Sequence, residues 1–155
     1  MIVLGIDAAA KSGWGIVDTT AGRPRLLDFG IAKVGNYRSL TAVVGAAIKL
    51  GAAKAAIEFP YVSVNPDTAL KLGTVVGRWM QECDRAALAY ETFTASQWQM
   101  QLLSGLINNR SPREDRKRAA AIWVKATFGI VALEDEADGI CLASWRAKVG
   151  RFSGQ

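Results

Sequence analysis

The sequence predicts an α/β protein in which a mixed, five-stranded sheet carries helices on both faces. Short apolar runs of strand length alternate with longer segments whose apolar residues recur at helical spacing, in the order βββαβαβααα. The first three strands follow one another without a helix between them, which indicates a meander. A helix separates the third strand from the fourth, and we expect this fourth strand to lie parallel to the first.

The predicted strands are short and mostly apolar. Ile2–Asp7 is a nearly continuous apolar run, which is typical of a strand buried on both faces. Gly13–Val17 is expected to be its antiparallel partner, after a turn at AAAKSG. The remaining strands are predicted at Leu26–Lys33, Lys54–Glu58 and Ala89–Thr94.

Capping residues mark several of the predicted helices. Asn65 is an expected N-cap, with Pro66 at the first helical position. Residues 111–114 read Ser-Pro-Arg-Glu, a capping box that predicts a helix start, and Gly129 is expected to end that helix. The helices are predicted at Tyr37–Leu50, at Pro66–Ala87, at Ala95–Leu106, from the capping box to Phe128, and from Glu134 or Asp135 to Val149.

Length and composition indicate one domain. Half of the 155 residues are hydrophobic, which is enough for a substantial core, and we expect one domain over residues 1–150 and a short flexible tail over 151–155. The chain has neither a run of about 18 apolar residues nor a basic segment before the first strand, so a cytoplasmic protein is expected. Cys83 and Cys141 lack CxxC spacing and are expected to be buried, reduced thiols.

The absence of histidine restricts the chemistry that the chain can perform. It excludes Ser-His-Asp and Cys-His nucleophiles and the HExxH zinc site. Catalysis would have to depend on carboxylates, lysines, tyrosines or metal ions. The 19 basic residues exceed the 14 acidic residues, for a net charge of +5, which permits a polyanionic partner without proving one.

Four carboxylates have an unusual setting. Asp7 and Glu58 each end a strand that is predicted to be buried, and Asp135 and Asp138 lie three residues apart at the start of the last helix. Burying a carboxylate is costly unless a positive group binds it. Because oxygen ligands suit hard cations, the pattern predicts a pair of Mg²⁺ or Mn²⁺ ions.

Simpler explanations exist for three of these residues. Asp135 and Asp138 lie in the first turn of a helix, where negative charge stabilises the helix dipole. Asp7 precedes a tight turn and could hydrogen-bond the backbone there. Glu58 is harder to explain in this way because apolar residues flank it on both sides.

The order of these motifs resembles the RuvC family of Holliday-junction resolvases. The carrying segments are GID with a glycine-rich second strand, IEFPYVSVNPDTALKLGTVVG, FTASQWQMQLLSG followed by a basic helix start, and the final DEAD. The similarity covers nearly the whole chain. It implies a ribonuclease-H-like fold, a homodimer, and divalent-metal-dependent cleavage of four-way or otherwise branched DNA.

The resemblance also implies roles for individual residues. Asp7, Glu58, Asp135 and Asp138 match the family's catalytic carboxylates in type and order, and they would hold two Mg²⁺ or Mn²⁺ ions per active site, with Asp7 as the bridging ligand. Lys117 resembles a family lysine near the scissile phosphate.

Two departures from the family pattern stand out. Ala8-Ala9-Ala10 follows the first aspartate, where Pro-Gly is common, and Gly139 follows the last aspartate, where alanine is usual. They indicate a divergent member, such as one from a phage or mobile element that acts in the cytoplasm of a bacterial or phage-infected cell.

Further residues are candidates for contacts with DNA. Arg113 and Arg116 lie at a helix start, a natural position for phosphate, although a solvated helix face explains them equally well. Tyr61 follows Glu58 and could stack on an exposed base, or it could cover the core instead. Lys11 and Lys71 could contact backbone phosphates.

Other functions remain open at this point. One alternative is a ribonuclease-H-like nuclease of relaxed specificity, which would act on branched DNA or structured RNA. Another is a junction-binding protein that has lost catalysis, although all four carboxylates are present. Sugar-kinase-like phosphotransferases begin with a similar strand and hairpin, but that fold needs two such domains.

Overall fold

A computed structural model describes residues 1–59 and 65–149. In this part of the chain a five-stranded sheet has the order β3-β2-β1-β4-β5. Strands β1 to β3 form an antiparallel meander, and β4 and β5 run parallel to β1. The strands are β1 (Ile2–Asp7), β2 (Lys11–Asp18), β3 (Arg25–Lys33), β4 (Lys54–Glu58) and β5 (Tyr90–Phe93).

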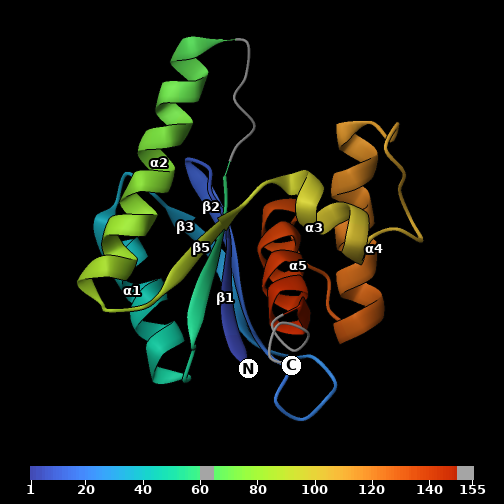
Figure 1. The fold of residues 1–155 in the computed structure, drawn as a ribbon, viewed down its shortest axis with the longest axis horizontal. Helices are drawn as coiled ribbons and strands as arrows, with labels where there is room; N and C mark the ends of the chain where they lie inside the picture. The colour runs from blue at the N-terminus through green and yellow to red at the C-terminus, as the bar shows by residue number, and fades with distance from the viewer. Residues whose placement is uncertain (60–64, 150–155) are drawn as a thin grey trace.

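Helices cover both faces of the sheet. Helices α1 and α2 lie on one face, and α3, α4 and α5 lie on the other (Figure 1). The predicted α/β fold with a mixed sheet is therefore confirmed, and the meander followed by two parallel strands is the ribonuclease-H-like arrangement. The helices are α1 (Tyr37–Lys49), α2 (Pro66–Arg85), α3 (Ala95–Leu102), α4 (Arg113–Phe128) and α5 (Glu134–Val149).

The start of α4 differs from the prediction. Pro112, and not Ser111, is the N-cap, and it makes no capping hydrogen bond. Ser111 Oγ instead accepts a hydrogen bond from the backbone N–H of Asn108 at 2.9 Å, so the side chain serves the preceding turn. The predicted capping box at residues 111–114 was wrong because this local turn uses the hydroxyl first.

A capping box does occur at α3, where none was predicted. Gln97 accepts a hydrogen bond from the backbone N–H of Thr94 at 2.7 Å. This helix is shorter than expected, since it ends at Leu102 and not at Leu106. The following residues instead form a turn, in which the Leu106 and Ile107 N–H groups bond the Leu103 carbonyl.

The sheet divides the core into two apolar clusters. The cluster under α1 and α2 includes Trp79, and the cluster under α3 to α5 includes Trp98 and Trp145. Trp79 and Trp145 are buried, and Trp123 is half-buried against the second cluster. Both cysteines are buried and unpaired, also as predicted.

Glycines let α5 approach the first two strands very closely. A Cβ atom added at Gly139 would lie 2.6 Å from Trp14 Cα and 2.7 Å from the Gly13 carbonyl oxygen. A Cβ atom at Gly13 would collide with the Asp135 carbonyl oxygen. Gly139 therefore lets the start of α5, with its two aspartates, press onto β2.

Candidate metal centre

The four predicted carboxylates line one cleft of about 510 Å³ at the carboxyl ends of strands β1 and β4. Asp7 and Glu58 come from the ends of β1 and β4, and Asp135 and Asp138 come from the first turns of α5. The cleft also contains basic side chains. These are Arg113, Arg116 and Lys117, all from α4.

The pairing of β1 with β4 brings Asp7 and Glu58 together. The two strands are parallel and adjacent, with Ile6 opposite Ile57, so the next residue of each strand emerges at the same edge of the sheet. Ligand sites in α/β folds commonly form at this edge, beyond the carboxyl ends of the strands. The residues before each acid are fully buried, which fixes both carboxylates at the boundary between core and cleft.

The loop after Asp7 is held by hydrogen bonds to the Ser12 hydroxyl. Ser12 Oγ accepts from the Ala9 N–H at 3.1 Å and donates to the Ala9 carbonyl at 2.6 Å. Trp79 in α2 donates its indole N–H to Ser12 Oγ at 2.9 Å. This network gives Ala8-Ala9-Ala10 a defined path without the Pro-Gly that is common in the resembled family.

Asp138 is the most deeply placed of the four acids. Its side chain is buried, and within the described residues its Oδ1 atom has no hydrogen-bond partner. A buried carboxylate oxygen without a partner is costly. Dipole compensation at the helix start does not by itself explain an acid in this position, because that effect needs no burial.

Burial and mutual repulsion raise the pKa values of three of the acids. Burial and the charge of Asp135 raise the pKa of Asp7 to about 6. Burial and the charge of Asp7 raise the pKa of Glu58 to about 7, against the hydrogen bond from Trp98, which lowers it. Burial and the charges of Asp7 and Glu58 also raise the pKa of Asp138 well above its usual range. The site therefore has more negative charge than its own basic residues neutralise.

Asp135 differs from the other three because Lys117 pairs with it. Lys117 Nζ donates to Asp135 Oδ1 at 2.8 Å and lies 3.8 Å from Glu134. Burial lowers the pKa of Lys117, but the hydrogen bond and charge of Asp135, with the charges of Asp138 and Asp7, raise it above its ordinary value. The lysine is thus a cation held within the cleft.

The other predicted contact residues have different environments. Arg116 is held by the chain, since its guanidinium donates to the Ser111 and Asn109 carbonyls and to Gln99 Oε1. Arg113 lines the cleft. Lys11 and Lys71 are exposed and are not among the residues that line the cleft, while Tyr61 lies outside the described residues.

Trp98 was not predicted from the sequence to touch the site, and neither was Gln99, which lines the cleft. Trp98 in α3 is fully buried, and its Nε1 donates a hydrogen bond to Glu58 Oε2 at 2.7 Å. Thr94 and Gln97, which cap the start of α3, were the available signal, because they define where the helix begins and hence which face residue 98 occupies.

Comparison with solved structures identifies the fold. A structure of Thermus thermophilus RuvC in complex with a Holliday junction substrate has a TM-score of 0.76 at 19% identity, over 97% of this chain and 96% of that chain. A second Thermus thermophilus RuvC structure has a TM-score of 0.75 at 21% identity, over 99% and 97%. The chain has the RuvC fold. No protein-family model and no curated protein matches the sequence.

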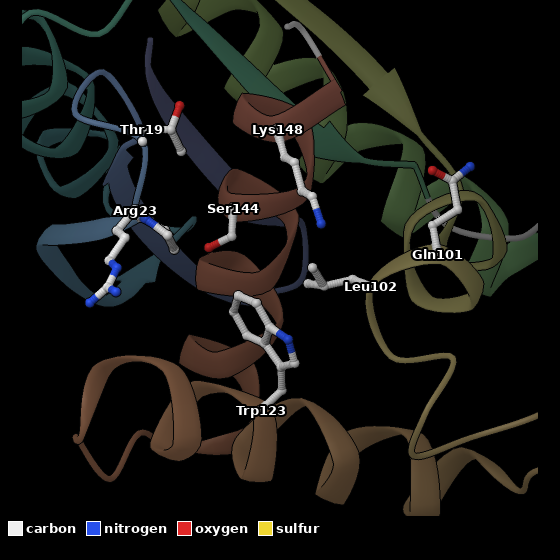
Figure 2. A pocket seen from close by; sticks show the side chains of 9 residues that line it. Thr19, Arg23, Gln101, Leu102, Trp123, Ser144 and Lys148 are labelled. Atoms are coloured by element: carbon white, nitrogen blue, oxygen red, sulfur yellow. The ribbon is translucent and has the colours of Figure 1, made fainter. Parts of the chain in front are cut away.

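A second cavity differs from the carboxylate cleft in the chemistry of its side chains. It has a volume of about 450 Å³, and Figure 2 shows Arg23, Lys148, Ser144 and Trp123 around it. It is reached from the later turns of α5, whereas the carboxylate cleft lies at the first turns. Among the described residues, no acidic side chain lines this cavity, so these residues offer no carboxylate ligand to a cation there.

The residues of the cleft fit a divalent cation in their chemistry. The ligand set consists of carboxylate oxygens, which hard cations prefer, and the unpartnered Asp138 oxygen and the raised pKa values indicate missing positive charge. As the side chains lie, no three acidic or cysteine residues of the described chain are grouped so that they could hold one metal ion. Asp135 instead accepts a hydrogen bond from Lys117.

No helix in the described residues is long and apolar enough to cross a membrane.

Proposed function

We propose that this protein is a divalent-metal-dependent endonuclease that resolves four-way DNA junctions by paired phosphodiester hydrolysis, acting as a homodimer. One observation carries the proposal. Asp7, Glu58, Asp135 and Asp138 line a single cleft at the strand ends of a RuvC fold, and three of these acids lack a positive partner within the described chain. A two-fold dimer would set two such clefts at a fixed separation for symmetric cutting.

Each acid has a role in this proposal. By the family resemblance, Asp7 would be shared by two Mg²⁺ or Mn²⁺ ions, with Glu58 on one ion and Asp138 and Asp135 on the other. Such ions would activate a water and stabilise the leaving 3′-oxygen. To bind a cation through Oδ1, Asp135 would have to turn away from Lys117, which donates a hydrogen bond to that oxygen at 2.8 Å.

The basic residues of the cleft would bind the DNA backbone. Lys117, once released by Asp135, has a charged amino group inside the cleft and can donate to an oxygen of the scissile phosphate. Arg113 lies in the first turn of α4 and can hold a neighbouring phosphate. Tyr61 stays a prediction for stacking on an exposed base, and Lys11, Lys71 and Arg116 stay predictions for contacts with backbone phosphates.

Two other functions use the same cleft. A general nuclease for branched DNA or structured RNA would need the same carboxylates, because the cleft sets the chemistry and not the choice of branch. A catalytically silent junction-binding protein would need the basic surface but not the buried acids. The burial cost of Asp138 favours a catalytic protein over the silent one.

Cleavage of a labelled synthetic four-way junction tests the proposal. The wild type should introduce paired, symmetric nicks with Mg²⁺ or Mn²⁺, none with chelator, and none in a linear duplex. Asp7→Asn should bind the junction with unchanged affinity and fail to cut it. Asp28→Asn is the matched control, because Asp28 lies exposed on β3, away from the cleft, and this variant should cut normally.

Other outcomes separate the alternatives. Equal cutting of forks, flaps and junctions would replace the resolvase with a general branch nuclease. Tight binding by the wild type without cutting in either metal would contradict the catalytic proposal and leave a binding protein. A single unpaired nick per junction would contradict the dimer.

A further inference from the structure

The indole of Trp98 makes a contact that distinguishes it from the other buried tryptophans. Its ring is fully buried in the apolar cluster under α3 to α5, and its one polar atom, Nε1, lies 2.7 Å from Glu58 Oε2. Trp145 and Trp79 also donate indole hydrogen bonds, but to the neutral acceptors Gln101 Oε1 and Ser12 Oγ. Within the described residues, Trp98 alone among these three donates to a carboxylate.

This contact fixes the orientation of Glu58. An indole N–H can only donate, so it always favours the charged carboxylate and never competes for a cation. The ring is held by close packing on all sides, so the donor cannot follow a carboxylate that rotates. Glu58 Oε2 is thereby kept on the core side of the cleft.

The second oxygen of Glu58 has a different environment. Within residues 1–59 and 65–149, no hydrogen bond is made to Glu58 Oε1. When a rigid donor holds one carboxylate oxygen, the side chain cannot rotate freely. The other oxygen is then the one available to bind a cation, and its direction is fixed. Groups that orient metal ligands in this way typically change metal affinity by about 10- to 100-fold when they are removed.

We propose that Trp98 is a positioning residue that makes Glu58 a one-oxygen ligand, through Oε1, for the divalent cation of the cleft. The inference rests on the proposed metal-dependent function. It adds a residue that contacts neither the cation nor the DNA, and that lies on α3, a helix to which the sequence assigned no role in the site.

A purely structural role for Trp98 predicts different behaviour. If the indole only fills the core, then removing its N–H should lower stability without changing metal affinity. Trp145→Phe supplies this comparison, because it removes a buried indole and a 2.8 Å hydrogen bond from the same apolar cluster, but the acceptor is Gln101, which does not line the carboxylate cleft.

The test measures Mn²⁺ affinity by electron paramagnetic resonance of the free ion, without DNA. Trp98→Phe should weaken binding by about 10- to 100-fold relative to the wild type, whereas Trp145→Phe should bind as the wild type does. Equal affinities of Trp98→Phe and the wild type would overturn the inference alone. No Mn²⁺ binding by the wild type would overturn the proposed metal site as well, so the two failures are distinguishable.

A second measurement needs no change at Trp98 and applies if that variant does not fold. In the ¹⁵N-indole spectrum of the wild type, the Trp98 resonance should shift when Mg²⁺ is added and should move upfield in Glu58→Gln, which weakens the acceptor. The Trp145 resonance should stay in place in both experiments. A Trp98 resonance that ignores both Mg²⁺ and Glu58→Gln would overturn the inference.

Discussion

Glu58 and Glu91 lie on the neighbouring parallel strands β4 and β5, yet their surroundings differ in one decisive respect. Glu91 pairs with Arg146 on α5 and with Lys54 on β4, and the hydrogen bond from Arg146 lowers its pKa. Within the described residues, Glu58 forms no ion pair and accepts a hydrogen bond from the neutral indole of Trp98, and burial together with the charge of Asp7 raises its pKa to about 7.

The difference shows how this chain treats carboxylates that serve different purposes. An acid that holds the sheet edge to α5 receives positive charge from the protein itself. Within the described residues, Asp7, Glu58 and Asp138 of the cleft have no ion pair, which destabilises the protein without a ligand and favours any cation that enters. Removing either glutamate should therefore have opposite effects on stability and unequal effects on cleavage.

The largest expected effect is on cleavage. Glu58→Gln should cut a four-way junction on the order of 10³-fold more slowly, since losing a metal ligand removes several kcal/mol of transition-state stabilisation. Glu91→Gln should keep a rate near that of the wild type because its side chain does not line the cleft. Single-turnover rates at saturating Mg²⁺ measure both. Similar losses of cleavage rate in the two variants would contradict the claim that Glu58, and not Glu91, is a metal ligand.

The next effect is on the stability of the metal-free protein. The folded-state pKa of Glu58 is raised from 4.5 to about 7, so the folded protein binds more protons and its stability falls as pH rises through this window, by at most about 3 kcal/mol. Glu58→Gln should reduce this fall. Urea denaturation between pH 4.5 and 7.5 in chelator tests this prediction. If the free energy of unfolding falls with pH as steeply in the variant as in the wild type, the raised pKa of Glu58 is not the cause of the fall.

Lys117→Met should move two quantities in opposite directions. The variant loses a cation from the cleft and frees Asp135, so half-maximal activity should need less Mg²⁺. Its maximal rate should fall by about 10- to 100-fold, the size of one lost charged contact to a phosphate. A metal titration of cleavage gives both values. A rise in the Mg²⁺ requirement would contradict the proposed competition between Lys117 and the cation.

The smallest effect belongs to Glu91. Its lowered pKa means that its ion pairs contribute stability above the unfolded-state value, and this contribution is lost as pH falls through the folded-state pKa. Because the side chain is 40% exposed, Glu91→Gln should cost no more than about 1 kcal/mol at pH 7. The cost should vanish at low pH, as measured by urea denaturation. If Glu91→Gln still lowers the free energy of unfolding at low pH, the loss arises from packing and not from the ion pairs.

Features set by strand order were predictable from the sequence. Asp7 and Glu58 end apolar runs that a parallel pairing brings to one edge, and both strands ended where the sequence indicated. Gly139 stood out as a departure from the family pattern, and its close approach to Trp14 now explains it. Local chemistry along the chain was enough for these inferences.

Features that depend on packing between distant elements were not predictable. The pairing of Lys117 with Asp135 joins α4 to α5, and the bond from Trp98 to Glu58 joins α3 to β4. Thr94 and Gln97 mark where α3 begins, but neither contact follows from the sequence alone, because each depends on how far a helix rotates as it packs. Ser111 failed as a cap for a related reason, since a competing turn at Asn108 was not visible in the spacing.

The most direct test of the account is a calorimetric titration of the wild-type protein with Mn²⁺ at pH 6.5, in two buffers of different ionisation heat. Mn²⁺ should bind with net proton release, because a cation displaces protons from Asp7 and Glu58, whose pKa values are raised to about 6 and about 7. Glu91→Gln should bind Mn²⁺ as the wild type does, and Glu58→Gln should bind Mn²⁺ more weakly. Absence of binding, or binding that Glu58→Gln leaves unchanged, would contradict the claim that this cleft is a metal centre.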